Sequence, residues 1–125
     1  MKADTLARIA AGAAGSDCQF VSEAPFVLGC DELPTGVSAG VYVAEDREGR
    51  VLYVGSVRRS PGSSALRDRI EREHSKEGHK ACDWDRVHVV ALNPECSTER
   101  VRQVESIIAH ELKPAYGIHP GGWDK

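Results

Sequence analysis

Two short runs, Ala39-Gly40-Val41-Tyr42-Val43 and Leu52-Tyr53-Val54-Gly55-Ser56, decide the fold of this chain. Both are rich in β-branched and aromatic residues and carry a glycine near one end, a pattern typical of strands. The polar segment 45–50, Glu-Asp-Arg-Glu-Gly-Arg, separates them and predicts a turn. The two runs therefore predict an antiparallel hairpin.

The hairpin is expected to bring two tyrosines together. If it closes symmetrically around Asp46 and Gly49, Tyr42 lies directly opposite Tyr53, with Cβ atoms roughly 4.5–5.5 Å apart. The other face then carries aliphatic side chains and is the expected core face: Val41, Val43, Leu52 and Val54. Stabilisation of the hairpin alone would be enough to explain such a tyrosine pair. Whether the pair also has a functional role has to be judged from the rest of the chain.

Periodic patterns on either side of the hairpin predict an α+β structure. Residues 3–14 and 65 to about 75 space their apolar side chains as helices do, and residues 84–92 alternate as a third strand. A last helix is expected to be capped by Ser97 or Thr98 and to end before Pro114. Residues 17–37 contain prolines and glycines, which predicts irregular or edge-strand structure. The expected fold is a small, mainly antiparallel three-stranded sheet flanked by helices.

The same patterns suggest a division of the chain. We expect residues 1–38 to form a helical N-terminal extension packed on the core, residues 39–117 to form the main domain, and residues 118–125 to form a C-terminal tail. A length of 125 residues is sufficient for one hydrophobic core.

Composition limits the function classes. No run approaches the ~18 consecutive apolar residues of a membrane span, and charged residues interrupt the N-terminus, so we expect a cytoplasmic protein without membrane contact. The four cysteines have no C-x-x-C spacing, which argues against a zinc site or a disulfide framework. The net charge is −3, so any nucleic-acid surface must be a local basic patch.

Gly40-Val41-Tyr42 and Tyr53-Val54-Gly55, followed by Arg69 on one helix and Glu105 on a later one, resemble the GIY-YIG nuclease family over residues 39–117. The resemblance implies a metal-dependent endonuclease that hydrolyses phosphodiester bonds in nucleic acid, with DNA the expected substrate. A domain this small would take its specificity from a homodimer, a partner protein or a structured substrate.

The resemblance also implies roles for individual residues. Tyr42 or Tyr53 would act as general base or orient the attacking water, and Arg69 would neutralise the scissile phosphate. Glu105 would hold one Mg²⁺ or Mn²⁺ ion that keeps most of its waters. His74 is a further catalytic candidate, one position beyond the place where the family carries a basic or aromatic residue. The expected substrate contacts are Gly55, Ser56, Arg58, Arg59, Arg67 and Arg72.

An alternative reading gives these residues structural roles. Arg69 can pair with Asp68 or Glu73, and Glu105 can pair with Arg102. The chain would then be a non-catalytic domain of the same fold that binds nucleic acid or a protein. The acidic net charge favours this alternative, as does Gly117 at a position where the family commonly has asparagine.

Overall fold

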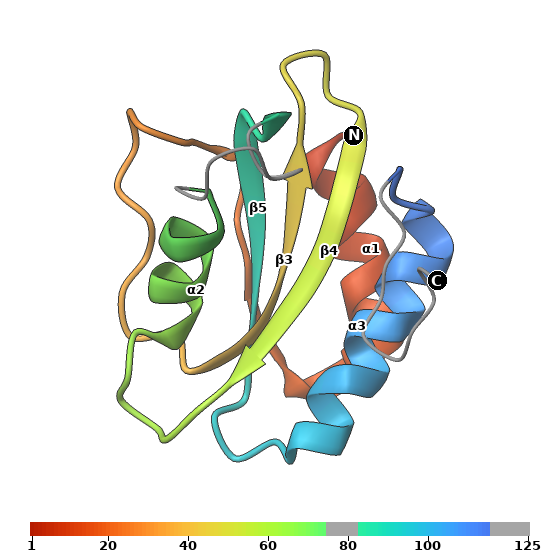
Figure 1. Ribbon diagram of the computed structural model, residues 1–125. Helices are drawn as coiled ribbons and strands as arrows, with labels where there is room; N and C mark the ends of the chain where they lie inside the picture. Colours follow the sequence, from red (N-terminus) through yellow and green to blue (C-terminus); the bar gives the residue numbers. More distant parts are fainter. Residues whose placement is uncertain (75–82, 116–125) are drawn as a thin grey trace.

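The computed structural model describes residues 1–74 and 83–115, which form one antiparallel sheet with helices on both faces (Figure 1). The helices are α1 (Ala3–Ala14), α2 (Ala65–His74) and α3 (Thr98–Leu112), and a 3₁₀ turn, η1 (Gly15–Asp17), follows α1. The strands are β1 (Cys18–Val21), β2 (Phe26–Val27), β3 (Ala39–Glu45), β4 (Val51–Arg58) and β5 (Arg86–Leu92). The predicted α+β class is confirmed.

The sheet has five strands, so the predicted three-stranded sheet was wrong in its strand number. The order is β1-β5-β3-β4, with β2 also pairing with β5, and all these pairs are antiparallel. Residues 17–37, expected to be irregular or edge-strand material, supply β1 and β2. Pro25 separates these two strands, and each is too short to show an alternating pattern.

The hairpin register also differs from the symmetric prediction. Tyr42 pairs with Gly55 and Ala44 pairs with Tyr53, and an irregularity follows between Ala44 and Glu45. The offset from the predicted pairing is two residues, which leaves both tyrosines on one face of the sheet.

The turn explains this register. The Asp46 amide donates a hydrogen bond to the Arg50 carbonyl (3.0 Å), and the Asp46 side chain accepts from the amides of Glu48 and Arg50. Gly49 adopts φ +87°, a conformation that favours glycine. The irregularity beyond the turn directs Leu52 to the face of the tyrosines rather than to the face of Val41 and Val43, as was predicted.

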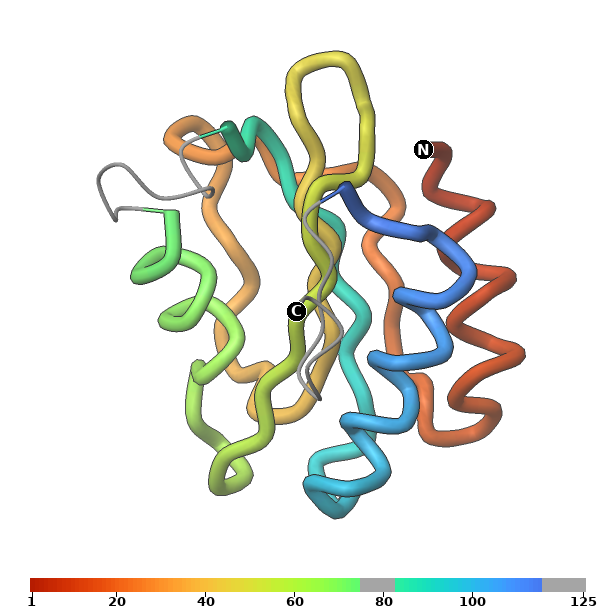
Figure 2. The backbone as a smooth tube through the Cα atoms, turned by 45° about the vertical axis from the view of Figure 1, so that its right-hand side comes forward, coloured from red at the N-terminus to blue at the C-terminus, as the bar shows by residue number. Residues whose placement is uncertain are grey.

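Two hydrophobic clusters lie on opposite faces of the sheet (Figures 1 and 2). Helices α1 and α3 cover the first face, whose buried residues include Leu6, Ala10, Val41, Val43, Val54, Val90, Val104 and Ile108. Helix α2 covers the second face, whose buried residues include Tyr42, Leu52, Leu66, Ile70, Trp84, Val87 and Val89. Residues 1–38 are thus part of the sheet and of both clusters.

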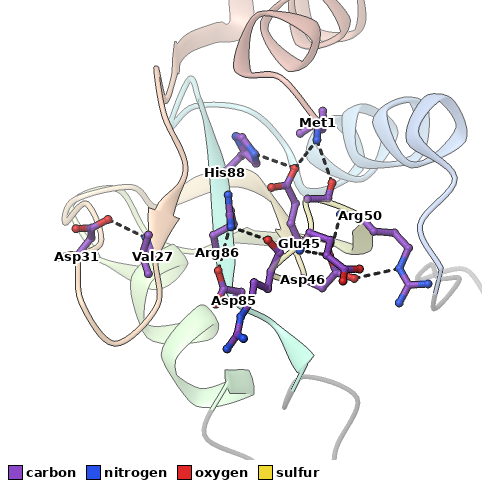
Figure 3. A network of polar contacts seen from close by, with 12 residues as sticks. Met1, Val27, Asp31, Glu45, Asp46, Arg50, Asp85, Arg86 and His88 are labelled. Atoms are coloured by element: carbon purple, nitrogen blue, oxygen red, sulfur yellow. Dashed lines mark hydrogen bonds and ion pairs between the residues drawn. The ribbon is translucent and has the colours of Figure 1, made fainter.

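A buried polar network joins the chain's first residue to the turn end of the sheet (Figure 3). The Met1 α-amino group lies 3.3 Å from Glu45 Oε2 and donates a hydrogen bond to the Gly49 carbonyl (3.0 Å). His88 Nε2 lies 3.1 Å from the same Glu45 oxygen, and both side chains are buried. These groups hold the turn end of β3 against α1.

None of the described helices combines the length and the apolar character needed to cross a membrane.

Candidate functional site

The outer edge of β4 brings side chains from both faces of the sheet into one cleft. Because β4 is the last strand in the sheet order, α2 on one face and α3 on the other both reach its edge. The cleft has a volume of about 240 Å³. Its polar lining comprises Tyr53, Ser56, Arg58, Arg59, Arg69, Thr98, Arg102 and Glu105. Three predicted catalytic residues, Tyr53, Arg69 and Glu105, are therefore brought together.

Glu105 is the central acidic group of this cleft. Its side chain is buried, with only 2% of the residue's surface exposed. Burial raises its pKa from the ordinary 4.5 to about 7, against the opposing effects of the Ser56 hydrogen bond and of the positive charges of Arg102 and Arg69. Burial therefore moves the titration of this carboxyl group from the acidic range towards neutral pH.

The two oxygens of Glu105 have different environments. The Ser56 hydroxyl donates a hydrogen bond to Oε1. Oε2 is buried and has no hydrogen-bond partner within residues 1–74 and 83–115. An unpartnered buried carboxylate oxygen is costly, so Oε2 is the atom best placed to receive a cation or a water. Ser56, predicted as a substrate contact, holds Glu105 in place.

The two predicted tyrosines occupy different positions. Their ring centroids lie 6.1 Å apart, but Tyr53 lines the cleft whereas Tyr42 is buried beneath it. Burial raises the pKa of Tyr42 above its usual range, and the nearby Arg69 guanidinium opposes this shift. Trp84, which was not among the predicted site residues, stacks on Tyr53 with the ring centroids 5.5 Å apart.

Gly55 is needed for the packing of this aromatic group. A Cβ at this position would lie 2.5 Å from Tyr42 Oη and 2.9 Å from Tyr53 Cε2. Since Tyr42 pairs with Gly55 across the hairpin, its ring crosses the strand where no side chain stands. Gly55, predicted as a substrate contact, thus lines the cleft and also makes room for both tyrosines.

A second cleft of about 310 Å³ adjoins the first, and both are lined by Val57, Arg59 and Arg69. Arg72 lines only this second cleft. Together the two clefts carry the guanidinium groups of Arg58, Arg59, Arg69, Arg72 and Arg102 and the carboxyl groups of Asp68 and Glu105. A chain of net charge −3 therefore has a locally basic surface along the edge of β4.

Two predicted site residues lie elsewhere. Arg67 and His74 line a third cleft, facing residues 28–35, which shares no lining residue with the cleft of Glu105. Helix geometry explains this separation. Arg69 and Arg72 are three positions apart and share a face of α2, whereas Arg67, two positions before Arg69, lies on a different face. Arg67 also lies 3.3 Å from Asp68.

The guanidinium of Arg58 is fixed in part by a hydrogen bond within the chain, since its Nε donates to the Cys96 carbonyl (2.9 Å).

Gly117 and the predicted tail 118–125 lie outside the described residues.

The donor atoms around Glu105 restrict the way a metal could bind. Within the described ranges, no three His, Cys, Asp or Glu side chains gather as a metal-binding group. Mg²⁺ commonly binds through one or two carboxylates and keeps several waters. A lone buried carboxylate with an unpartnered oxygen fits that mode, and it does not fit a dehydrated site with several protein ligands.

No protein-family model matches this chain, and the searches of curated proteins and of solved structures also gave no match, so the site is interpreted from its own geometry.

Proposed function

We propose that the chain is a metal-dependent endonuclease of the GIY-YIG type, which hydrolyses phosphodiester bonds in nucleic acid, with DNA the expected substrate. The observation that supports this most strongly is the Glu105 carboxyl group, buried with one oxygen unpartnered in a cleft otherwise rich in arginine. An acidic side chain among phosphate-binding groups fits cation-assisted phosphate chemistry better than it fits anion binding alone.

Phosphodiester hydrolysis needs positive charge on the developing phosphorane and a group that receives the proton of the attacking water. Arg69 and Arg102 can supply charge-assisted hydrogen bonds to the phosphate oxygens. Arg69 lines the cleft and lies close enough to the buried Tyr42 hydroxyl for the two groups to interact. We therefore assign phosphate binding to Arg69 and a positioning role to Tyr42.

Tyr53 is the better candidate for the proton-accepting or water-orienting role, because it lines the cleft while burial keeps Tyr42 neutral. A phenol with an ordinary pKa of ~10 needs nearby cations to act as a base, and the arginines of the cleft are such cations. Glu105 would hold Mg²⁺ or Mn²⁺, which when bound would supply further positive charge at the phosphate.

Binding of a cation would also favour the charged form of Glu105, because it offsets the burial that raises the pKa of this carboxyl to about 7. Metal binding at this site is therefore expected to weaken as the pH falls below about 7. A second copy of the chain or a partner protein would add the contacts that determine specificity.

One alternative remains, a non-catalytic domain that binds nucleic acid through the same arginines. The specific observation in its favour is that the arginines of the two clefts can bind phosphates without Glu105. Metal binding discriminates between the two, since a phosphate-binding domain does not need a cation at Glu105.

The test is a titration of Mn²⁺ followed by electron paramagnetic resonance, using the parent chain, Glu105→Gln and Glu111→Gln. Glu111 is exposed on the same helix, so its variant controls for the loss of one negative charge. We expect Glu105→Gln alone to lose the bound Mn²⁺ signal. Equal Mn²⁺ binding by all three proteins would refute the assigned metal site.

A further inference from the structure

The second cleft has the chemistry of a separate phosphate site. It lies between the end of β4, the loop that follows and the first turns of α2. Its polar lining is Arg59, Ser60, Ser63, Asp68, Arg69 and Arg72. Three of these side chains are arginines, and guanidinium groups match phosphate oxygens in geometry and charge.

Two details indicate that this cleft is suited to an anion. Ser63 Oγ is buried and has no hydrogen-bond partner in the part of the chain that the structure describes, so a hydroxyl is available there. Asp68, the one carboxylate of the lining, lies 3.3 Å from Arg67, and this pairing offsets its negative charge. The balance of charge in the cleft is positive.

Arg69 lines both clefts, which makes them parts of one continuous surface. We propose that the second cleft binds a phosphate group next to the one at Glu105, so that the protein recognises a nucleotide segment carrying two phosphates. This inference depends on the proposed function for the identity of the first phosphate. Arg59 and Arg72 then select the substrate, whereas Glu105 and Tyr53 serve the reaction.

The consequence concerns the class of substrate. A ligand with a single phosphate can occupy only one of the two clefts, whereas a nucleoside with phosphates on both its 3′ and 5′ oxygens can reach both. The second phosphate adds charge-assisted hydrogen bonds from Arg72 and Arg59, and one such bond corresponds to an affinity gain of about tenfold or more.

The experiment compares two probes by isothermal titration calorimetry with the metal-free full chain: thymidine 3′,5′-bisphosphate and thymidine 5′-monophosphate. We expect the bisphosphate to bind at least about tenfold more tightly. Arg72→Ala should lose most of that preference.

Arg47→Ala is the matched control. Arg47 is exposed in the turn at the opposite end of β4, and its replacement removes the same charge. The control should keep the preference for the bisphosphate. Because the bisphosphate also carries more charge, the contrast between the two variants separates a local site from general attraction.

Three results would overturn the inference: equal affinities for the two probes, no detectable binding of the bisphosphate, or an unchanged preference in folded Arg72→Ala. Loss of the preference in Arg47→Ala to the same extent would overturn it as well. The experiment separates failure of the second site from failure of the proposed function. If the chain prefers the bisphosphate through Arg72 but cleaves no nucleic acid, only the nuclease proposal is refuted. Cleavage without the preference would refute only the second site.

Discussion

Replacement of Glu105 by glutamine should stabilise the folded chain at alkaline pH. Glutamine has nearly the same shape and can still accept the Ser56 hydrogen bond, but it carries no charge that burial disfavours. The parent protein, by contrast, must bury a carboxylate with one unpartnered oxygen whenever Glu105 is ionised.

The magnitude follows from the pKa of this carboxyl, which burial raises from 4.5 to about 7. Between these two values the folded chain binds more protons than the unfolded chain, so the free energy of unfolding falls as the pH rises. At 1.36 kcal/mol per pH unit, the loss across this range is about 3 kcal/mol. It is absent below pH 4.5 and complete above pH 7.

The assay is urea denaturation in metal-free buffer at several pH values between 5 and 8.5, with Glu111→Gln as the exposed control on the same helix. We expect Glu105→Gln to exceed the parent by up to about 3 kcal/mol at pH 8.5, with the difference shrinking towards pH 5. A constant difference across the pH range, or a variant less stable than the parent at pH 8.5, would refute the reasoning. Adding Mg²⁺ should stabilise the parent and leave the variant unchanged.

Three further predictions concern the groups around Glu105. Ser56→Ala removes a hydrogen bond that lowers the pKa of Glu105, so the acidic limb of the cleavage rate against pH should move to higher pH; an unchanged profile would argue against this contact. Gly55→Ala places a Cβ 2.5 Å from Tyr42 Oη and should lower the free energy of unfolding by about 1–3 kcal/mol in urea denaturation; full stability would contradict the observed register. Tyr53→Phe should lose cleavage, whereas Tyr42→Phe should lose about 1 kcal/mol of stability because its buried hydroxyl interacts with the Arg69 guanidinium; a Tyr53→Phe protein as active as the parent would exclude Tyr53 from catalysis.

Local signals in the sequence were enough to predict most helices and strands. Ser97 or Thr98 was expected to cap the last helix, and the structure has Ser97 as the cap, whose Oγ accepts a hydrogen bond from the Arg100 amide (3.0 Å). Residues 17–37 were predicted only as irregular or edge-strand structure, because the partner of β1 and β2 is β5, about 60 to 74 residues later in the chain. Pairing over such a separation leaves no periodic pattern in segments of four and two residues.

The identity of the main site residues could be predicted from the sequence. Their positions could not, where these depend on the strand register of the hairpin or on the direction in which a helix side chain points. Glu105 was selected by its place after the two tyrosines and Arg69 in the sequence pattern, and the structure buries it. The burial of Tyr42 behind Tyr53 depends on the irregular turn end of the hairpin, which the symmetric pairing omitted. His74 was selected by its distance along the chain from Arg69, but the helix directs it to a different cleft.

The most direct test of the account is a nicking assay on supercoiled plasmid with Mg²⁺ or Mn²⁺, run on the parent chain, Glu105→Gln and Glu111→Gln, each with a chelator control. We expect metal-dependent nicking by the parent and by Glu111→Gln, and none above the chelator background by Glu105→Gln. Nicking by Glu105→Gln at the parent's rate would contradict the central claim that this buried carboxyl group is the essential acidic residue of the site.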